Sequence, residues 1–311
     1  MNTAFAALTR AGMRPHYSTS LGRAYLGDSA KLLRVLPDRS IAVILTSPPF
    51  GLRRKKSYGN PSAENYIEWF RQFASEALRV LRDDGSFVIE IGGSWTPRVP
   101  TRSLYNYELL IDLVRNIGFH LAQDFFWYNP AKMPGPAQWV TIDRVRCTDA
   151  VSTIWWLSKS STPKANNKQV LVPYSDSMRR LFKHGYNNGT RPSGHNVSDV
   201  WATDNGGAIP KNLLSFSNTS SSDNYQVGCR RNKVPPHPAR FPLELPRFFV
   251  DFLTTSKQDI ILDIFAGSNV TGYVAESAGR KWLAFESRRD FLEASKFRFG
   301  LNVDLEKARS K

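Results

Sequence analysis

The chain has 311 residues, of which 41% are hydrophobic and 22% are charged. That length suits two domains of roughly 100–200 residues each, or one domain with a large insertion. Lys and Arg number 42 against 27 Asp and Glu, and the resulting charge of +15 favours a polyanionic partner such as nucleic acid. No apolar run approaches the ~20 residues of a membrane-spanning helix. The two distant cysteines suit neither a disulfide framework nor a zinc site. We therefore expect a cytoplasmic protein without metal.

The N-terminal part of the chain contains two predicted strands. Residues 1–20 have no acidic side chain, and we interpret them as a frayed arm that contacts DNA phosphates. Residues 23–26 (RAYL) and 41–45 (IAVIL) are typical of strands, and the second is apolar throughout, as in a strand buried on both faces of a parallel sheet. Residues 46–50 (TSPPF) follow at once, and their two successive prolines predict a rigid turn at the end of that strand.

Helices and strands then alternate as far as residue 157. Apolar residues at helical spacing predict a helix over residues 66–81, which a strand at 86–91 follows. A helix at 104–114 and strands at 119–128 and 149–157 continue the pattern. This alternation predicts a doubly wound α/β sheet.

Residues 159–236 differ in composition from the rest of the chain. Ser, Asn, Gly, Pro and basic residues dominate, and apolar periodicity disappears, so we interpret the segment as an irregular insertion. After residue 236 the α/β pattern returns, with a helix at 243–253, a strand at 260–265, a small-residue turn at 265–272 that enters a helix, and a strand at 282–285.

The turn at 265–272 (FAGSNVTG) carries the features of a nucleoside site. Its glycine directly after a buried strand lets the backbone approach a ligand, and the following helix offers free N–H groups. The next strand ends in Glu286, whose carboxylate can bind both hydroxyls of a ribose. The loop lacks the leading glycine pair that admits a pyrophosphate, which favours S-adenosylmethionine over a nicotinamide dinucleotide.

The position of this loop in the chain predicts an unusual strand order. A cofactor loop normally opens its sheet, yet here too little chain follows residue 265 to complete one. The remaining strands must come from residues 20–157, so we expect a circularly permuted sheet in which the TSPPF turn lies beside the cofactor loop. The predicted organisation is a catalytic half at 1–158, an insertion at 159–236 and a cofactor half at 237–311.

Taken in order, these motifs resemble a known family. The TSPPF turn, the 265–272 loop and the run HPARFP at 237–242 are similar to those of amino-methyltransferases of the permuted, β-type order. The likeness is greatest to cytosine-N4 DNA methyltransferases of the PvuII type, which belong to restriction–modification systems, and it covers about residues 19–300. The resemblance implies a Rossmann-like methyltransferase sheet that binds S-adenosylmethionine and modifies double-stranded DNA, with residues 159–236 as the target-recognition region.

The resemblance also implies roles for single residues. The catalytic group is Ser47, Pro48, Pro49, Phe50 and Glu90. The cofactor group is Asp28, His237, Pro238, Arg240, Phe241, Phe265, Ala266, Gly267, Ser268, Asn269, Thr271, Gly272 and Glu286. The candidate DNA contacts are Arg53, Arg54, Lys55, Lys56, Arg191, His195, Arg230 and Arg231.

The chemistry of N4 methylation suits these residue types. Oxygen acceptors such as the Ser47 hydroxyl and a proline-turn carbonyl can bind the amine N–H groups of cytosine, and Phe50 can stack on a flipped base. The PvuII-type enzymes that the chain resembles carry Asp at the end of this strand, where this chain has Glu90, so either proton acceptance or a structural role is open for that residue. A serine at position 47 favours cytosine, since adenine-N6 enzymes usually have Asp or Asn there.

Other functions remain as alternatives. Methylation of cytosine C5 is not expected, because neither Cys147 nor Cys229 follows a proline. Adenine-N6 methylation, a catalytically silent DNA-binding relative and a nicotinamide oxidoreductase stay open. We further expect a monomer in the bacterial cytoplasm, associated with the nucleoid when bound to DNA. We also expect a cognate endonuclease that acts on the same DNA site, and the likeness of the insertion suggests a CAGCTG-like recognition sequence.

Overall fold

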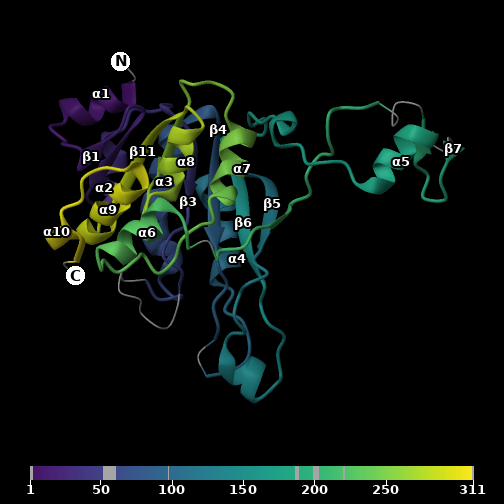
Figure 1. Ribbon diagram of the computed structural model, residues 1–311, viewed down its shortest axis with the longest axis horizontal. Coiled ribbons are helices and arrows are strands. Elements are labelled where there is room, and N and C mark those ends of the chain that lie inside the picture. The colour runs from purple at the N-terminus through teal and green to yellow at the C-terminus, as the bar shows by residue number, and fades with distance from the viewer. Residues whose placement is uncertain are drawn as a thin grey trace. The chain divides into compact units, whose positions relative to one another are not determined.

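The computed structural model describes residues 3–51, 61–96, 98–185, 189–198, 203–219 and 221–309 (Figure 1). The chain forms two compact units. The larger contains Met1–Ala165 and Asn212–Lys311, and the smaller contains Asn166–Lys211.

A mixed sheet forms the centre of the larger unit. In sheet order, its strands among the described residues are β1 (Tyr17–Ser18), β2 (Gly22–Leu26), β11 (Lys281–Glu286), β10 (Ile260–Asp263), β3 (Ile41–Thr46), β4 (Leu81–Ile91), β6 (Val151–Ser158), β5 (His120–Tyr128) and β9 (Leu213–Ser215). The run from β2 to β4 is parallel, whereas β6 lies antiparallel between β4 and β5. β10 therefore occupies the middle of the sheet although it comes late in the chain.

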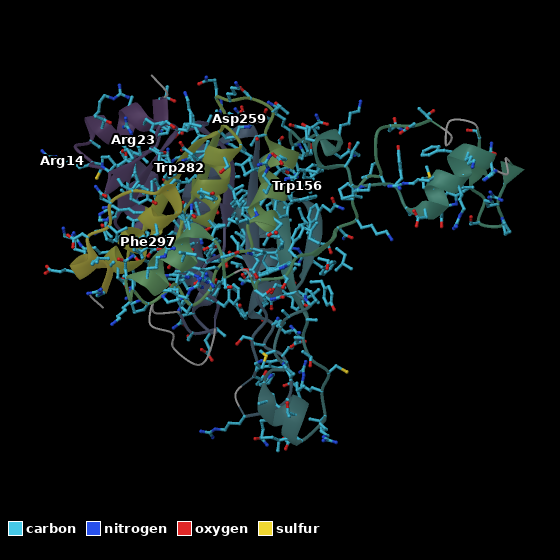
Figure 2. The ribbon with its side chains drawn as sticks, viewed as in Figure 1. Arg14, Arg23, Trp156, Asp259, Trp282 and Phe297 are labelled. Atoms are coloured by element: carbon cyan, nitrogen blue, oxygen red, sulfur yellow. The ribbon has the colours of Figure 1, made fainter. Side chains whose placement is uncertain are left out.

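Helices cover both faces of this sheet. Adjacent residues of a strand point to opposite faces, as two neighbours on β6 show. Trp155 belongs to the core shared with α1–α4, whereas Trp156, labelled in Figure 2, packs against Phe252 of α7. The helices of the first face are α1 (Thr3–Arg10), α2 (Ser29–Val35), α3 (Tyr66–Val80) and α4 (Tyr105–Asp112), which continues as the π-helical turn η1 (Leu113–Ile117). Those of the second face include α7 (Glu244–Leu253) and α8 (Val270–Ser277).

A second, smaller apolar cluster joins the C-terminal helices to α6. Tyr225 and Cys229 of α6 (Asn224–Arg231) are buried against Ala294 and Ala308. The remaining elements of this cluster are α9 (Arg289–Ser295), η5 (Lys296–Phe299) and α10 (Leu305–Arg309). Residues 224–231 therefore pack as part of the larger unit.

The smaller unit, residues 166–211, has little core. Its described elements are η3 (Asn167–Val170), α5 (Asp176–His184), β7 (Gly189–Thr190) and β8 (Asn196–Val197). None of its described side chains belongs to the buried core. Its packing rests on an edge-to-face contact of Tyr174 with Phe182 at 4.9 Å and on the Asn205 N–H, which donates to the Tyr174 hydroxyl at 2.9 Å.

Most predicted elements are confirmed, and the differences have physical causes. Residues 3–10 form a helix, not the predicted frayed arm, because Ala4 and Leu8 are fully buried against the core. The separate unit, 166–211, is narrower than the predicted insertion, since β9 pairs with β5 and α6 packs against the C-terminal helices. β4 begins at Leu81, five residues before the predicted strand.

Candidate active site

A cavity of about 530 Å³ opens where β3, β4, β10 and β11 end, at the carboxyl edge of the parallel strands. Ligands of open α/β sheets bind at this edge, and the volume suits a small-molecule site. The TSPPF turn and the 265–272 loop both line the cavity, so the two motifs that lie more than 200 residues apart in the chain meet there.

Ser47 and Glu90 form a hydrogen-bonded pair at the cavity wall. Ser47 follows β3, and Glu90 lies near the end of the neighbouring strand β4. The Ser47 hydroxyl donates to Glu90 Oε2 at 2.7 Å, and only 4% of Glu90 is exposed. Phe50 packs against Gly92 at this wall, and a Cβ atom at position 92 would lie 2.6 Å from the Phe50 ring. The pair presents a hydroxyl oxygen backed by a carboxylate to any ligand in the cavity.

Two buried tyrosines fix the backbone on either side of this pair. The Tyr66 hydroxyl donates to the Pro49 carbonyl at 2.8 Å, and the Tyr105 hydroxyl donates to the Gly92 carbonyl. Their rings pack edge to face at 4.9 Å. Burial raises the pKa of Tyr105, so its hydroxyl stays protonated and able to donate.

We expect Tyr66→Phe to lower turnover about tenfold and to lower the free energy of unfolding by about 1 kcal/mol, because the Pro49 carbonyl loses its buried donor. Tyr25→Phe is the matched control: the Tyr25 hydroxyl is also buried but has no partner in the part of the chain that the structure describes. That control should leave turnover unchanged. Methyl-transfer kinetics and urea unfolding of both variants check this, and equal losses in the two would contradict it.

The 265–272 loop is held by Glu286 at the end of β11. Gly267 N–H donates to Glu286 Oε2 and Arg288 N–H donates to Oε1, each at 2.8 Å. Burial raises the pKa of the Glu286 carboxyl. Gly267 has φ +51°, and a Cβ atom there would lie 3.0 Å from the His237 ring, so this position favours glycine on both conformational and steric grounds.

Asp263, the last residue of β10, connects this loop to the catalytic turn. Its Oδ1 accepts from Thr46 Oγ1 at 2.7 Å and from Phe265 N–H at 3.0 Å, and its Oδ2 accepts from Thr271 Oγ1 at 2.7 Å. Thr46 directly precedes Ser47, so one carboxylate fixes both motifs. Burial raises the pKa of Asp263 to about 6.

We expect the stability of the protein to depend on the ionisation of Asp263. Its folded-state pKa, about 6, lies above the usual 3.8, so its contribution to stability is complete below pH 3.8 and is lost as the pH rises through 6. In the Asp263→Asn variant the amide stays neutral at every pH. The unfolding free energy of the wild type minus that of the variant should therefore fall by roughly 2 kcal/mol between about pH 4 and pH 7.5. Urea unfolding at both pH values measures this, and a constant difference would refute it.

The structure brings most of the predicted site residues to one cavity. All five predicted catalytic residues line it, as do Asp28, His237, Arg240, Phe241, Phe265, Ala266, Gly267, Ser268, Thr271 and Glu286. Pro238, Asn269 and Gly272 are not among its lining residues. Asn269 instead caps α8: its side chain accepts from Gly272 N–H and donates to the Tyr17 hydroxyl. Asn269 and Gly272 thus stabilise the 265–272 loop without lining the cavity.

The predicted DNA contacts are distributed over separate parts of the chain. Residues 53–56 lie outside the described residues. Arg191 and His195 are exposed in the smaller unit, whereas Arg230 and Arg231 lie on the exposed side of α6, in the larger unit. The sequence prediction had placed all four in one recognition region.

Several residues at the site were not predicted from the sequence. Asp263 ends the buried strand that leads into the 265–272 loop, a signal that could have been used. Arg298 donates from its buried side chain to the Ser268 carbonyl at 2.6 Å, and Asn218 donates to the Arg240 carbonyl at 2.7 Å. No local pattern marks these two. Trp69 and Phe73 of α3 line the cavity beside Phe265, but their spacing predicts only a core face.

The charges that line the cavity favour a cationic ligand. Four carboxylates contribute, from Asp28, Glu90, Asp263 and Glu286, and the lining lysine and arginine residues are Lys132 and Arg240. Aromatic side chains form flat parts of the cavity wall, and the small residues of the 265–272 loop form a narrow part. In the described residues no group of His, Cys, Asp and Glu is arranged to hold a metal ion.

This fold and this site define a methyltransferase that acts on DNA. The chain belongs to the DNA methylase family, whose model matches residues 41–297 and so includes both cavity motifs. It is similar to the type II methyltransferase M.PvuII of Proteus hauseri, with 47% identity over 93% of this chain and 86% of that protein. The type II methyltransferase M.ScaI of Streptomyces caespitosus is 26% identical over 94% of this chain and 86% of the relative.

Solved structures agree with this assignment. The PvuII DNA methyltransferase (cytosine-N4-specific) has a TM-score of 0.77 and 42% identity, and the match covers 95% of this chain and 93% of that one. A DNA modification methylase of Thermus thermophilus, solved with S-adenosyl-L-methionine, has a TM-score of 0.56 at 18% identity over 90% of this chain and 93% of that one, and it shows the fold alone. The predicted methyltransferase fold is confirmed.

Proposed function

We propose that the protein transfers a methyl group from S-adenosylmethionine to the N4 amine of a flipped cytosine in duplex DNA. The observation that carries this is the Ser47–Glu90 hydrogen bond in a cavity shared with the glycine loop, in a chain 47% identical to M.PvuII. The solved PvuII DNA methyltransferase, 42% identical to this chain, is cytosine-N4-specific. The protein is then the modification partner of a cognate endonuclease, and acts as a monomer in the bacterial cytoplasm.

The residues of the cavity fit S-adenosylmethionine. Glu286 is buried, accepts from Gly267 N–H and lines the cavity, and it would bind the ribose hydroxyls. Asp28 also lines the cavity and would accept from the adenine amine. The four carboxylates suit a positively charged sulfonium. When bound, this cofactor supplies the electrophilic methyl group. His237, Arg240 and Phe241 line the same cavity and would hold the outer side of the cofactor.

The catalytic turn makes the cytosine amine nucleophilic. The N4 lone pair is delocalised into the ring, so the free amine is a weak nucleophile. The Ser47 oxygen and a carbonyl of the proline turn accept the two N–H groups and favour a pyramidal nitrogen. Phe50 packs on the flipped base and keeps it in the cavity. Positioning supplies most of the rate enhancement in such a transfer.

Glu90 takes up the proton that methylation releases. The N4–methyl bond forms as the sulfur–methyl bond breaks, and the amine then loses one proton. Ser47 passes this proton through its hydrogen bond to Glu90 Oε2, which is 2.7 Å from the Ser47 oxygen. The Glu90 carboxylate is thus the final acceptor of the proton in this proposal.

Sequence recognition belongs to residues 159–236, within which 166–211 form a separate unit. This unit carries six Lys and Arg against three Asp. Arg191 and His195 are exposed there and can contact phosphates or guanine edges. Arg230 and Arg231 on α6 and the basic run at residues 53–56 add phosphate contacts.

Nucleoside mass spectrometry tests the proposal. Unmethylated duplex DNA is incubated with the protein and S-adenosylmethionine and then digested. N4-methylcytosine is the expected product, and mapping it identifies the recognition sequence. N6-methyladenine would overturn the substrate assignment but keep the enzyme class, and the absence of any methylated base would favour a catalytically silent DNA-binding protein.

A further inference from the structure

An arm projects from the ends of β4, β5 and β6, beside the Ser47–Glu90 pair. It consists of residues 92–104, which follow β4, and residues 129–150, which connect β5 to β6 and include η2 (Gln138–Ile142). Figure 1 shows this part of the chain extending beyond the lower end of the sheet. The arm begins two residues after Glu90, so its base lies beside the cavity.

The arm is internally packed. Trp95 is its centre: the Arg146 guanidinium lies 3.9 Å from the Trp95 ring centroid, and Trp139 packs on Trp95 edge to face at 5.7 Å. Arg102 forms an ion pair with Asp149 at 2.5 Å, and Arg146 donates to the Pro100 carbonyl at 2.6 Å. These contacts join both segments of the arm, so it is a preorganised element.

One turn of the arm presents two side chains next to the cavity. Asn129 begins this turn, where its side chain accepts from Ala131 N–H at 3.1 Å and its carbonyl accepts from Lys132 N–H at 3.1 Å. Lys132 is exposed and lines the cavity. Its neighbour Met133 is 81% exposed. A cation that lines the cavity is therefore followed directly in the chain by an exposed apolar side chain.

The outer surface of the arm has the same mixed character. Arg98, Lys132 and Arg144 are exposed on the arm together with Asp143, whereas Arg102, Arg146 and Asp149 take part in its internal contacts. Ile142 and Val145 are 66% and 62% exposed. A positive surface with protruding apolar side chains matches duplex DNA, where phosphates attract the cations and apolar side chains pack against or between bases.

We propose that the arm is a DNA-contacting element separate from residues 166–211, in which Lys132 binds a phosphate of the strand that carries the target base and Met133 packs against the bases beside it. This inference rests on the proposed function, because only a base that leaves its stack places DNA at this cavity. The arm then holds the distorted duplex while the smaller unit reads its sequence.

Duplex binding as a function of salt tests the Lys132 contact. Fluorescence anisotropy is measured for a duplex containing the target site, with S-adenosylhomocysteine present. Lys132→Ala should weaken binding several-fold and reduce the slope of log K against log salt by about one. Lys257→Ala is the control, since Lys257 is exposed in the turn before β10, at the opposite edge of the sheet. An unchanged slope for Lys132→Ala, or an equal change for Lys257→Ala, overturns the assignment.

Methyl transfer tests the Met133 contact. Met133→Ala should lower turnover several-fold on a paired target, and a mismatch at the target cytosine should restore it, because a mismatched base costs less to unstack. A loss that persists on the mismatched duplex contradicts the proposed packing. The salt slope is a binding measurement, so it decides the role of Lys132 even where the nucleoside assay detects no N4-methylcytosine.

Discussion

Ser47→Ala is expected to retain DNA and cofactor binding and to lose turnover by a factor on the order of 10² or more. The variant removes the hydroxyl that donates to Glu90 Oε2 at 2.7 Å, and with it both the acceptor for the cytosine amine and the route for its proton. The backbone of the turn is held independently by Tyr66, which donates to the Pro49 carbonyl, so the loss should not arise from misfolding.

Single-turnover methyl transfer separates this effect from binding. The dissociation constants for duplex DNA and S-adenosylmethionine should stay within about twofold of the wild type. Ser40→Ala is a matched control, because the Ser40 hydroxyl donates to the Pro37 carbonyl and lies outside the lining of the cavity. Full activity of Ser47→Ala would remove the hydroxyl from the mechanism.

Glu90→Gln is the second variant with a large expected effect, a loss of turnover of roughly 10²–10⁴-fold. Glutamine has nearly the same size and still accepts the hydrogen bond from Ser47, but its amide cannot take up the proton that the amine releases. Because Glu90 is 4% exposed, water gives little replacement for the carboxylate. Affinity for S-adenosylmethionine should change little.

The control for this variant is Glu76→Gln, which removes a carboxylate that pairs with Arg79 away from the cavity. Glu90→Asp distinguishes chemistry from packing. It keeps the carboxylate but shortens the side chain by one methylene group, so activity should lie between those of the wild type and Glu90→Gln. If Glu90→Gln has normal turnover, the carboxylate is structural, the second interpretation that the sequence left open.

The sequence predicted those parts of the site that lie at the ends of strongly apolar strands. Ser47 directly follows one strongly apolar strand and Glu286 ends another. Parallel strands bring their carboxyl ends to one edge, so the strand pattern alone places the two residues together. Family motifs then supplied the chemistry. The same reasoning located Gly267, because a tight approach after a buried strand requires glycine there.

Contacts that depend on tertiary packing could not be predicted in this way. Arg298 reaches Ser268 across 30 residues, and Tyr225 accepts from His237 N–H within a region whose composition looked irregular. Weak amphipathic patterns were also misread: the N-terminal segment has only Ala4 and Leu8 as fully buried anchors. For Lys132, a position in a loop gave no sign that the fold brings it to the cavity.

The late position of β10 has a consequence for how the protein is made. β10 lies between β11 and β3, pairing Ile261 with Val43, and so joins residues separated by more than 200 positions. Until the ribosome has synthesised this strand, β2 and β3 belong to two unjoined fragments with exposed strand edges, and such edges aggregate. Closing so long a loop also slows folding. The nascent chain therefore has no complete cavity, and methyl transfer begins only once β10 and β11 have left the ribosome.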